Sequence, residues 1–259
     1  MSKVFDIPVV VFSMGERTEK VCIASFQKLG FKNIINLNQK IGFSDKLKIF
    51  FELYNSYESN LFIRTDADRI CLPGIEVLCQ KTIKDREENS QCYIIGEGLG
   101  YESFLENRRY RYATPHVYSR EVMKYCLDNS KKLINNIQKP ESFIGQYFKS
   151  NYKSLKNYEV LTNIHEYQQY PSKMYHAFLN RIARGHYSYY NLENIRKSHF
   201  YSYSMKKALK ESEHLNKKNM NYFDNIIEDT KLIELDNELG PIKEEDIDKF
   251  LIDLFTKFQ

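Results

Sequence analysis

The sequence predicts an α/β fold: a mixed, mainly parallel sheet with helices on both faces, followed by a helical extension. Three observations lead to this prediction. Strand-like apolar runs alternate with helical patterns from residue 7 to residue 68. Their connections are short, which favours parallel strands joined by right-handed crossovers. Beyond about residue 172 the strand signals end, and helical patterns rich in Lys, Glu and Asn take over.

The first part of this pattern contains three strands and two helices. Residues 7–12, Ile-Pro-Val-Val-Val-Phe, form a continuous apolar run, as expected for a strand buried on both faces. Gly30 marks the end of the first helix, and Ser44 and Asp45 offer an N-cap for the second. We expect strands over residues 7–12, 33–37 and 60–64, with helices over residues 16–29 and from residue 45.

The middle of the chain is less regular. Gly96, Gly98 and Gly100 favour a loop, and they lack the strand-to-helix context and spacing of a dinucleotide-binding loop. We expect a helix over residues 76–84, a strand over 92–95, a strand or turn over 113–118, and helices from residues 119 and 141.

The change in character of the sequence predicts two parts, a sheet domain over residues 1–185 and a helical extension over residues 186–259. The last helix has the clearest pattern, because its apolar side chains recur at i, i+3, i+4, i+7, i+8 and i+11. Its polar face is mainly acidic, so anionic lipid would repel it. We expect this helix to pack on the chain's own core or on a second copy in a homo-oligomer. The six apolar residues are Ile247, Phe250, Leu251, Leu254, Phe255 and Phe258.

The composition excludes several classes of protein. A hydrophobic fraction of 42% is typical of a folded chain, and a net charge of +4 is far from the concentrated basic surface of a nucleic-acid binder. The five cysteines show no zinc-site spacing, so we expect buried, reduced thiols. No stretch approaches the ~20 apolar residues that cross a bilayer, and no signal sequence is visible. We therefore expect a soluble, cytoplasmic protein.

Asp66 and Asp68 directly follow the third predicted strand. In open α/β sheets, ligands bind beyond the carboxyl ends of the strands. Two carboxylates at this spacing can converge on Mg²⁺ or Mn²⁺, which commonly takes one or two carboxylates together with substrate phosphates. Such a cation stabilises the charge on a departing diphosphate. We expect Asp66 and Asp68 to bind a divalent metal, although an Asp-x-Asp sequence also occurs in solvated turns.

Three stretches resemble bacterial glycosyltransferases of the GT-A type that build capsule or lipopolysaccharide: residues 9–13, 45–47 and 62–68. The resemblance covers roughly residues 7–175 and implies a nucleotide-diphospho-sugar transferase fold, which is Rossmann-like. It implies that Phe12 and Ser13, after the first strand, hold the nucleotide base, and that the Asp-x-Asp pair binds metal and diphosphate. By analogy, Lys46 contacts the diphosphate and Arg17 lies near the nucleotide. Arg69 is unusual after the motif and is itself a candidate phosphate contact.

Residues 165–170, His-Glu-Tyr-Gln-Gln-Tyr, are similar to a His-Asp-Tyr-Glu-Gln-Tyr-Tyr stretch of some bacterial sugar transferases. Many GT-A enzymes take a third metal ligand from this region, so the resemblance implies that role for His165. A structural or surface role is the alternative. Glu166 replaces the aspartate of the family stretch, which changes the reach of that acid.

Several other residues carry two interpretations. Glu141 opens a predicted helix, where the helix dipole favours an acid, or it is the general base that an inverting transferase needs. Arg108, Arg109 and Arg111 either clamp a phosphate or lie in a solvated loop. Five tyrosines near the C-terminal end are interpreted as core or interface residues: Tyr187, Tyr189, Tyr190, Tyr201 and Tyr203.

These observations predict a metal-dependent transferase of polysaccharide biosynthesis, with Mn²⁺ or Mg²⁺ as cofactor. It would move a sugar from a nucleoside diphosphate sugar to a saccharide or lipid-linked acceptor, and the acceptor would bring it to the periphery of the inner membrane. One alternative is a nucleotidyltransferase, although the loop after the first strand holds only Gly15 where such enzymes are Gly-rich. Another is a non-catalytic GT-A-like protein that binds a sugar or a partner protein.

Overall fold

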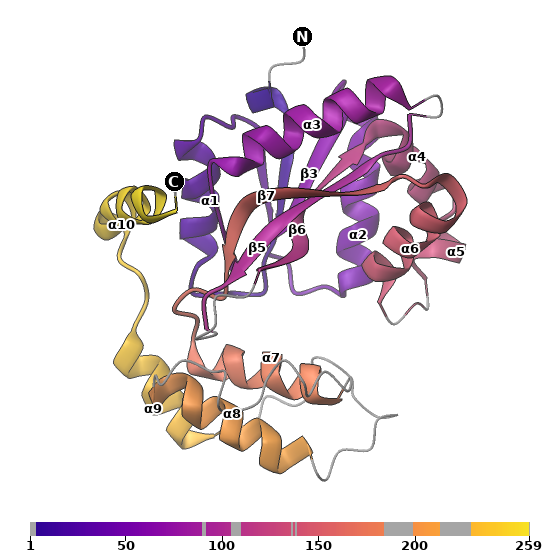
Figure 1. Ribbon diagram of the computed structural model, residues 1–259. Coiled ribbons are helices and arrows are strands. Elements are labelled where there is room, and N and C mark those ends of the chain that lie inside the picture. Colours follow the sequence, from indigo (N-terminus) through magenta and orange to yellow (C-terminus); the bar gives the residue numbers. More distant parts are fainter. Residues whose placement is uncertain are drawn as a thin grey trace.

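The computed structural model describes residues 4–89, 92–104, 110–135, 137, 139–183, 199–212 and 229–258. Within these ranges seven strands form one sheet in the order β2-β1-β3-β6-β5-β7-β4 (Figure 1). Strands β1, β2, β3, β5 and β7 run in one direction, and β6 and β4 run in the other. The predicted mixed, mainly parallel sheet is confirmed. The strands are β1 Val9–Phe12, β2 Ile34–Leu37, β3 Leu61–Asp66, β4 Arg69–Cys71, β5 Ile95–Glu102, β6 Tyr110–Ser119 and β7 Leu155–His165.

Helices cover both faces of the sheet, as predicted. Successive side chains of a strand point to opposite faces, and β1 shows the consequence. Val9 and Val11 lie in the core under α1 and α3, whereas Val10 and Phe12 lie in the core under α2, α4 and α6. The helices of this part are α1 Glu19–Lys28, α2 Phe43–Glu52, α3 Gly74–Glu88, α4 Arg120–Asp128, α5 Ser130–Leu133 and α6 Pro140–Tyr152, with short 3-10 turns at Val4–Asp6 and Leu53–Asn55.

The predicted helical extension is present and has a core of its own. It consists of α7 (Pro171–Ala183), α8 (His199–Ser212) and α9 (Thr230–Leu239), which lie below the sheet in Figure 1. Phe178 of α7 packs there with Met205 of α8 and Leu232 of α9. Since α7 contributes to this core, we propose a domain boundary ahead of Pro171 in place of the predicted one at residue 185.

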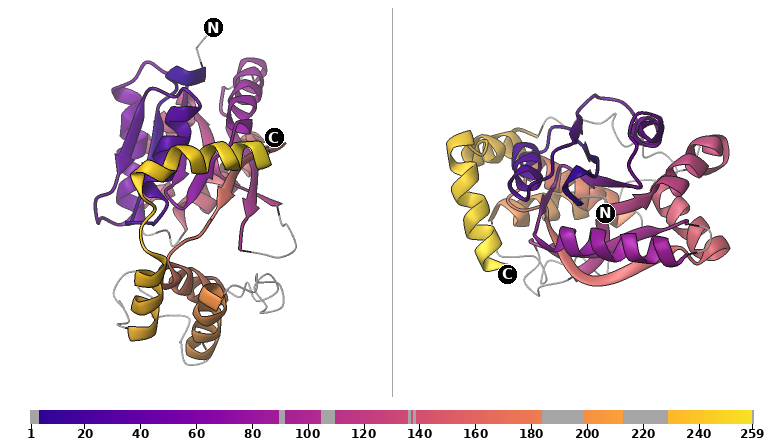
Figure 2. Two further views of the ribbon diagram at one scale, coloured as in Figure 1. Left: turned by 90° about the vertical axis from the view of Figure 1, so that its left-hand side faces the viewer. Right: turned by 90° about the horizontal axis from the view of Figure 1, so that it is seen from above.

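The last helix, α10 (Glu244–Lys257), returns to the sheet domain and lies beside α1 (Figure 2). Its apolar residues Ile247, Leu251 and Leu254 are buried in a core that includes Val21 of α1 and Ile164 of β7. Of the two expected partners for this face, the structure shows the chain's own core. Two ion pairs flank the contact, Lys20 with Glu244 and Lys28 with Asp248.

The glycine-rich stretch around residues 96–100 is not the expected loop, because it forms the middle of β5 beside β7. A Cβ atom at Gly96 would lie 2.2 Å from Thr82 Oγ1, and one at Gly98 would lie 2.3 Å from Thr162 Cγ2. Close approach of α3 and β7 therefore explains these glycines better than a turn does. Strands β4 and β7 were not predicted. The first half of β7 alternates between half-buried and exposed positions and contains no fully buried one, so it lacks the continuous apolar run by which the other strands were predicted.

All five cysteines are free, and Cys22, Cys71, Cys79 and Cys126 are buried, so the expected reduced thiols are confirmed for these four. Burial raises the pKa of each of the four thiols, which makes them poor nucleophiles. In the part of the chain that the structure describes, no helix has the length and apolar character needed to cross a membrane.

Candidate functional site

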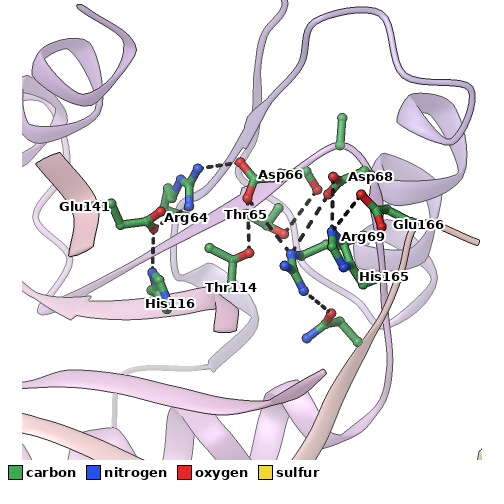
Figure 3. Close-up of polar contacts among 12 residues, drawn as sticks. Arg64, Thr65, Asp66, Asp68, Arg69, Thr114, His116, Glu141, His165 and Glu166 are labelled. Atoms are coloured by element: carbon green, nitrogen blue, oxygen red, sulfur yellow. Dashed lines mark hydrogen bonds and ion pairs between the residues drawn. The ribbon is translucent and has the colours of Figure 1, made fainter. Parts of the chain in front are cut away.

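The turn between β3 and β4 directs the two aspartates of the Asp-x-Asp motif to different partners (Figure 3). Asp66 forms an ion pair with Arg64 and accepts a hydrogen bond from Thr114 Oγ1 at 3.1 Å. Asp68 lies beside His165. The two aspartate side chains are 32% and 26% exposed, so both remain accessible to a ligand.

Asp68, His165 and Glu166 form a cluster in which one ligand atom from each residue lies within 4.8 Å of the others. His165 Nε2 is 3.3 Å from Asp68 Oδ2 and 3.7 Å from Glu166 Oε1. The antiparallel pairing of β4 with β7 sets Arg69 opposite His165 and so brings these distant segments together. Among the described residues, this cluster contains Glu166 and not the expected Asp66.

The donor set of this cluster fits a divalent cation. Carboxylate oxygens suit both Mg²⁺ and Mn²⁺, and the imidazole nitrogen favours Mn²⁺. Glu166 has a φ of 53° and Gln168 a φ of 47°, in the left-handed region that few non-glycine residues adopt. Backbone strain of this kind concentrates at functional sites. The turn after β7 is therefore a second indication that this cluster has a function.

Glu102 orients the His165 ring. Its Oε2 lies 2.8 Å from His165 Nδ1, and its other oxygen accepts from Arg111. Arg111 Nη2 is also 3.2 Å from Nδ1, but a guanidinium cannot accept a hydrogen bond. Because the contact with Glu102 is shorter than the contact with Arg111, we assign the hydrogen on Nδ1 to the bond with Glu102. Nδ1 therefore donates to Glu102, and Nε2 faces Asp68. A carboxylate behind a ligating histidine is the usual arrangement in protein metal sites.

The charges around His165 also favour a cation. Burial and the neighbouring Arg69 lower the pKa of His165, but the carboxylates of Glu102, Glu166 and Asp68 together raise it above its ordinary value. Excess negative charge at this position thus attracts a proton to Nε2. A divalent cation would compete with that proton for the same place.

Arg69 lies between the two aspartates and is 5% exposed. Its Nε is 4.0 Å from both an Asp66 oxygen and an Asp68 oxygen, and its Nη1 donates to Asn163 at 2.9 Å. Within the described ranges, this Nε has no hydrogen-bond partner. Leaving a buried N–H group unsatisfied costs about 1–3 kcal/mol. The position therefore suits an oxygen atom of a ligand, as the predicted phosphate contact requires.

Arg64 links Asp66 to Glu141. It is a buried cation in the middle of an apolar strand, 1% exposed, and it forms ion pairs with both carboxylates. Its guanidinium lies 4.7 Å from the centre of the Phe12 ring, which is itself buried. Burial raises the pKa of Asp66, and the neighbouring Asp68 adds to the rise against the opposing effect of Arg64.

Glu141 is held by charged partners. Its Oε1 lies 2.6 Å from His116 Nδ1 and also binds Arg64, while His116 Nε2 lies 3.1 Å from Glu97. Burial raises the pKa of Glu141, but Arg64 and His116 lower it to about 2. Burial lowers the pKa of His116, but Glu141 and Glu97 raise it to about 9. A carboxylate this acidic accepts protons poorly at neutral pH, so these surroundings do not favour the general-base interpretation of Glu141.

Lys46 and Arg17, expected near the nucleotide, bind the backbone of the chain instead. Lys46 is 2% exposed and donates to the carbonyl of Ser13, which is also buried. Arg17 Nε donates to the Gly240 carbonyl at 2.6 Å, and Nη1 donates to the Gln168 carbonyl at 3.0 Å. Their contacts hold the loop after β1 and the turn before α10.

Five residues of these networks were not predicted. The sequence could have indicated Arg64, because a charged residue inside an apolar strand must be paired with an opposite charge. Glu166 lies in the stretch that resembles the family, but the sequence did not indicate that it joins Asp68 and His165. Glu97, Glu102 and His116 carried no signal, since strand register brings them into place. Arg108, Arg109, Tyr187, Tyr189 and Tyr190 lie outside the described residues. Tyr201 and Tyr203 pack against the helical core, as expected.

The sequence matches no family model and no curated protein. Solved structures do match. A197 from STIV is 16% identical, with a TM-score of 0.41, over 62% of this chain and 85% of that one. A glycosyltransferase involved in the glycosylation of the major capsid of PBCV-1 is 10% identical, with a TM-score of 0.36, over 62% and 93%. A CMP:2-keto-3-deoxy-manno-octonic acid synthetase complexed with CTP is 13% identical, with a TM-score of 0.36, over 61% and 91%. Because these identities and TM-scores are low, the matches carry no argument about chemistry. Any argument about chemistry must come from the residues of this chain.

Proposed function

We propose that this protein transfers a sugar from a nucleoside diphosphate sugar to a saccharide or lipid-linked acceptor, with the help of a divalent cation. The observation that carries the proposal is the cluster of Asp68, His165 and Glu166 at the carboxyl end of β3. Ligands of α/β sheets bind at this end. The sequence resemblance to GT-A glycosyltransferases of bacterial polysaccharide biosynthesis supports the same assignment, including a cytoplasmic location beside the inner membrane.

In this proposal Asp68, His165 and Glu166 hold Mn²⁺ or Mg²⁺, which stabilises charge on the departing diphosphate. Glu102 keeps the His165 ring turned toward the cluster through its hydrogen bond with Nδ1. Arg69 Nε, buried without a hydrogen-bond acceptor in the described structure, would donate to an oxygen of the diphosphate. Asp66 is 32% exposed, and its carboxylate, 4.0 Å from Arg69 Nε, adds a hydrogen-bond acceptor to the site.

Isothermal titration with nucleoside diphosphates, with and without Mn²⁺, tests this proposal. We expect binding that depends on the metal and is lost in His165→Ala. Release of the free diphosphate from a nucleotide sugar would then establish transfer or hydrolysis. Release of pyrophosphate from a nucleoside triphosphate would instead identify a nucleotidyltransferase. Metal-dependent binding without turnover of any donor would indicate a binding protein, and absence of metal-dependent binding would overturn the proposal.

A further inference from the structure

The segment from residue 120 to residue 156 concentrates the positive charge of the chain. It contains eight Lys and Arg residues and three Asp and Glu residues, so its net charge is +5, whereas that of the whole chain is +4. Helices α4, α5 and α6 of this segment form one end of the sheet domain, and α10 lies at the opposite end (Figure 1). Since α10 carries five acidic residues and two lysines, the two ends differ in charge.

The three acidic residues of this segment are engaged by cations, but most of its exposed lysines have no such partner. Glu121 forms an ion pair with Arg86, and Asp128 forms one with Lys124. Glu141 is held against the sheet by the two cations described above. On α5, on α6 and at the residue that ends α6, four lysines are exposed and form no ion pair within the described part of the chain: Lys131, Lys132, Lys149 and Lys153.

The outward face of α6 carries part of this charge in a line. Residues 142, 146, 149 and 153 recur at i, i+4, i+7 and i+11, which places them on one stripe of the helix. All four are exposed and none is acidic: Ser142, Gln146, Lys149 and Lys153. Phe143 lies beside this stripe and is 40% exposed. The face therefore combines lysines with an exposed apolar ring.

A group of half-buried tyrosines borders the same face. The ring centre of Tyr147 on α6 lies 5.8 Å from that of Tyr125 on α4, and the ring centres of Tyr152 and Tyr93 are 4.8 Å apart. Lys132 Nζ lies 5.0 Å from the centre of the Tyr147 ring, which joins this group to α5. Tyrosine is enriched where an apolar phase meets water, because its ring is apolar and its hydroxyl group is polar.

These features favour an anionic bilayer over a nucleic acid as the partner of this face. Clusters of about 4–8 Lys and Arg residues on a helix are typical of surfaces that bind anionic lipid headgroups. A single-stranded nucleic acid also attracts lysines, but it needs free ring faces on which its bases stack. Here the tyrosine rings pack against one another and against Phe148.

We propose that the outward face of α5 and α6 docks on an anionic lipid bilayer. In this orientation the acidic α10, at the other end of the sheet domain, points away from a surface that would repel it. Ser142 and Gln146 also line a cavity of about 340 Å³ that reaches Asp66 and Arg69, so the docking face leads to the candidate site. The docking itself depends on charge and geometry; only its purpose, the meeting with a lipid-linked acceptor, rests on the proposed function.

Co-sedimentation of the full chain with vesicles tests this docking. We expect binding to vesicles of phosphatidylglycerol and phosphatidylcholine in equal parts to be at least about tenfold tighter than binding to phosphatidylcholine alone. Each lysine at an anionic surface contributes roughly fivefold to binding. A triple variant with Lys131→Gln, Lys149→Gln and Lys153→Gln should therefore bind the anionic vesicles about 100-fold more weakly than the wild type.

The matched control removes the same amount of charge elsewhere, through Lys20→Gln, Lys84→Gln and Lys231→Gln. These three lysines are exposed and pair with carboxylates outside the docking face. The control should bind anionic vesicles about as tightly as the wild type. High salt should release the wild type from the vesicles, because the screening length falls from about 10 Å at 0.1 M to about 3 Å at 1 M.

Equal binding to both kinds of vesicle, or equal losses in the triple variant and the control, overturns the inference. Binding of single-stranded polyuridylate or duplex DNA through the same lysines, without vesicle binding, also overturns it and assigns the face to a nucleic acid. The vesicle experiment needs no nucleotide sugar. Vesicle binding without turnover of any donor would therefore count against the proposed function alone, whereas turnover without vesicle binding would count against the docking alone.

Discussion

Two histidines of the sheet, His165 and His116, are each surrounded by carboxylates, but at different distances. Both ring nitrogens of His116 contact a carboxylate oxygen, at 2.6 Å and 3.1 Å. His165 has one close contact, at 2.8 Å from Nδ1, and its Nε2 lies 3.3 Å and 3.7 Å from its other two neighbours. A histidine that donates from both nitrogens is an imidazolium and has no lone pair for a metal.

This difference separates a salt-bridge network from a candidate metal site built of the same residue types. The His116 network satisfies its own charges, since Arg64 and His116 balance Glu97 and Glu141. The His165 cluster concentrates three carboxylates, from Asp68, Glu102 and Glu166, around one imidazole. Arg69 lies beside Asp68 and Arg111 forms an ion pair with Glu102, so the second region contains cations as well. A divalent cation there would take the place of the proton that the carboxylates attract to Nε2, whereas both ring nitrogens of His116 are already occupied by carboxylate contacts.

The largest effect is expected from Asp68→Asn, which keeps the shape of the side chain and removes its charge. If Asp68 binds the cation, turnover should fall by at least about 10³-fold, or about 4 kcal/mol of transition-state stabilisation. Single-turnover assays at saturating donor measure the loss. Asp128→Asn, at an exposed aspartate paired with Lys124, is the control. Near-normal turnover of Asp68→Asn would show that the cluster is not the metal site.

The next effect concerns the dependence of stability on pH. The pKa of His116 is raised from 6.5 to about 9, so its contribution to stability is complete below about pH 6.5 and is lost as the pH rises toward 9. The pKa of Glu141 is lowered from 4.5 to about 2, so its contribution is present above about pH 4.5 and is lost as the pH falls toward 2. At about 1.4 kcal/mol per pKa unit, each contribution is at most about 3.5 kcal/mol.

Urea unfolding of the wild type and of His116→Gln, at about pH 6 and about pH 9, measures the upper window. The free energy of unfolding of the wild type should fall between these two pH values more than that of His116→Gln. Parallel changes in the two proteins would mean that His116 is not a charged partner of Glu97 and Glu141.

The sequence was sufficient to predict the alternation of strands and helices, the sheet class and the apolar face of the last helix, because these follow from local apolar periodicity. It left open whether that face packs on the chain's own core or on a second copy. It also placed Asp66 and Asp68 at a strand end. It did not distinguish their roles, because the partner of each depends on other strands: Thr114 comes from β6 and His165 from β7. Lys46 and Arg17 were assigned by analogy to a ligand, and only tertiary contacts show that backbone carbonyls occupy them.

A smaller effect is expected from the choice of metal. A neutral imidazole among the ligands favours Mn²⁺ over Mg²⁺, so His165→Ala should weaken Mn²⁺ binding by about tenfold more than Mg²⁺ binding. His116→Ala is the comparison, because its ring lies in the network that needs no cation. Titration of both metals into both variants provides the measurement. An equal loss for the two metals in His165→Ala would exclude the imidazole as a ligand.

The smallest effect tests whether contacts outside the cluster hold its geometry. Arg17 donates to the carbonyl of Gln168 and to that of Gly240, so it ties the turn after β7 to the turn before α10. Glu166, the third member of the cluster, lies in the same strained turn as Gln168. Mutation of a residue that hydrogen-bonds to a metal ligand typically lowers metal affinity by about 10–100-fold. Arg17 contacts the backbone of the turn and not a ligand itself, so Arg17→Ala should weaken Mn²⁺ binding by up to about tenfold.

Lys20→Ala is the matched control for Arg17→Ala, because Lys20 also joins α1 to the C-terminal segment, but through an exposed ion pair with Glu244. Exposed ion pairs contribute little, and this one does not touch the turn that carries Glu166, so this variant should leave Mn²⁺ affinity unchanged. A lower melting temperature of Arg17→Ala with unchanged Mn²⁺ affinity would limit Arg17 to anchoring the C-terminal segment. Weaker Mn²⁺ binding in Arg17→Ala alone would show that the turn carrying Glu166 depends on this anchor, since both variants remove a cation that contacts the C-terminal segment.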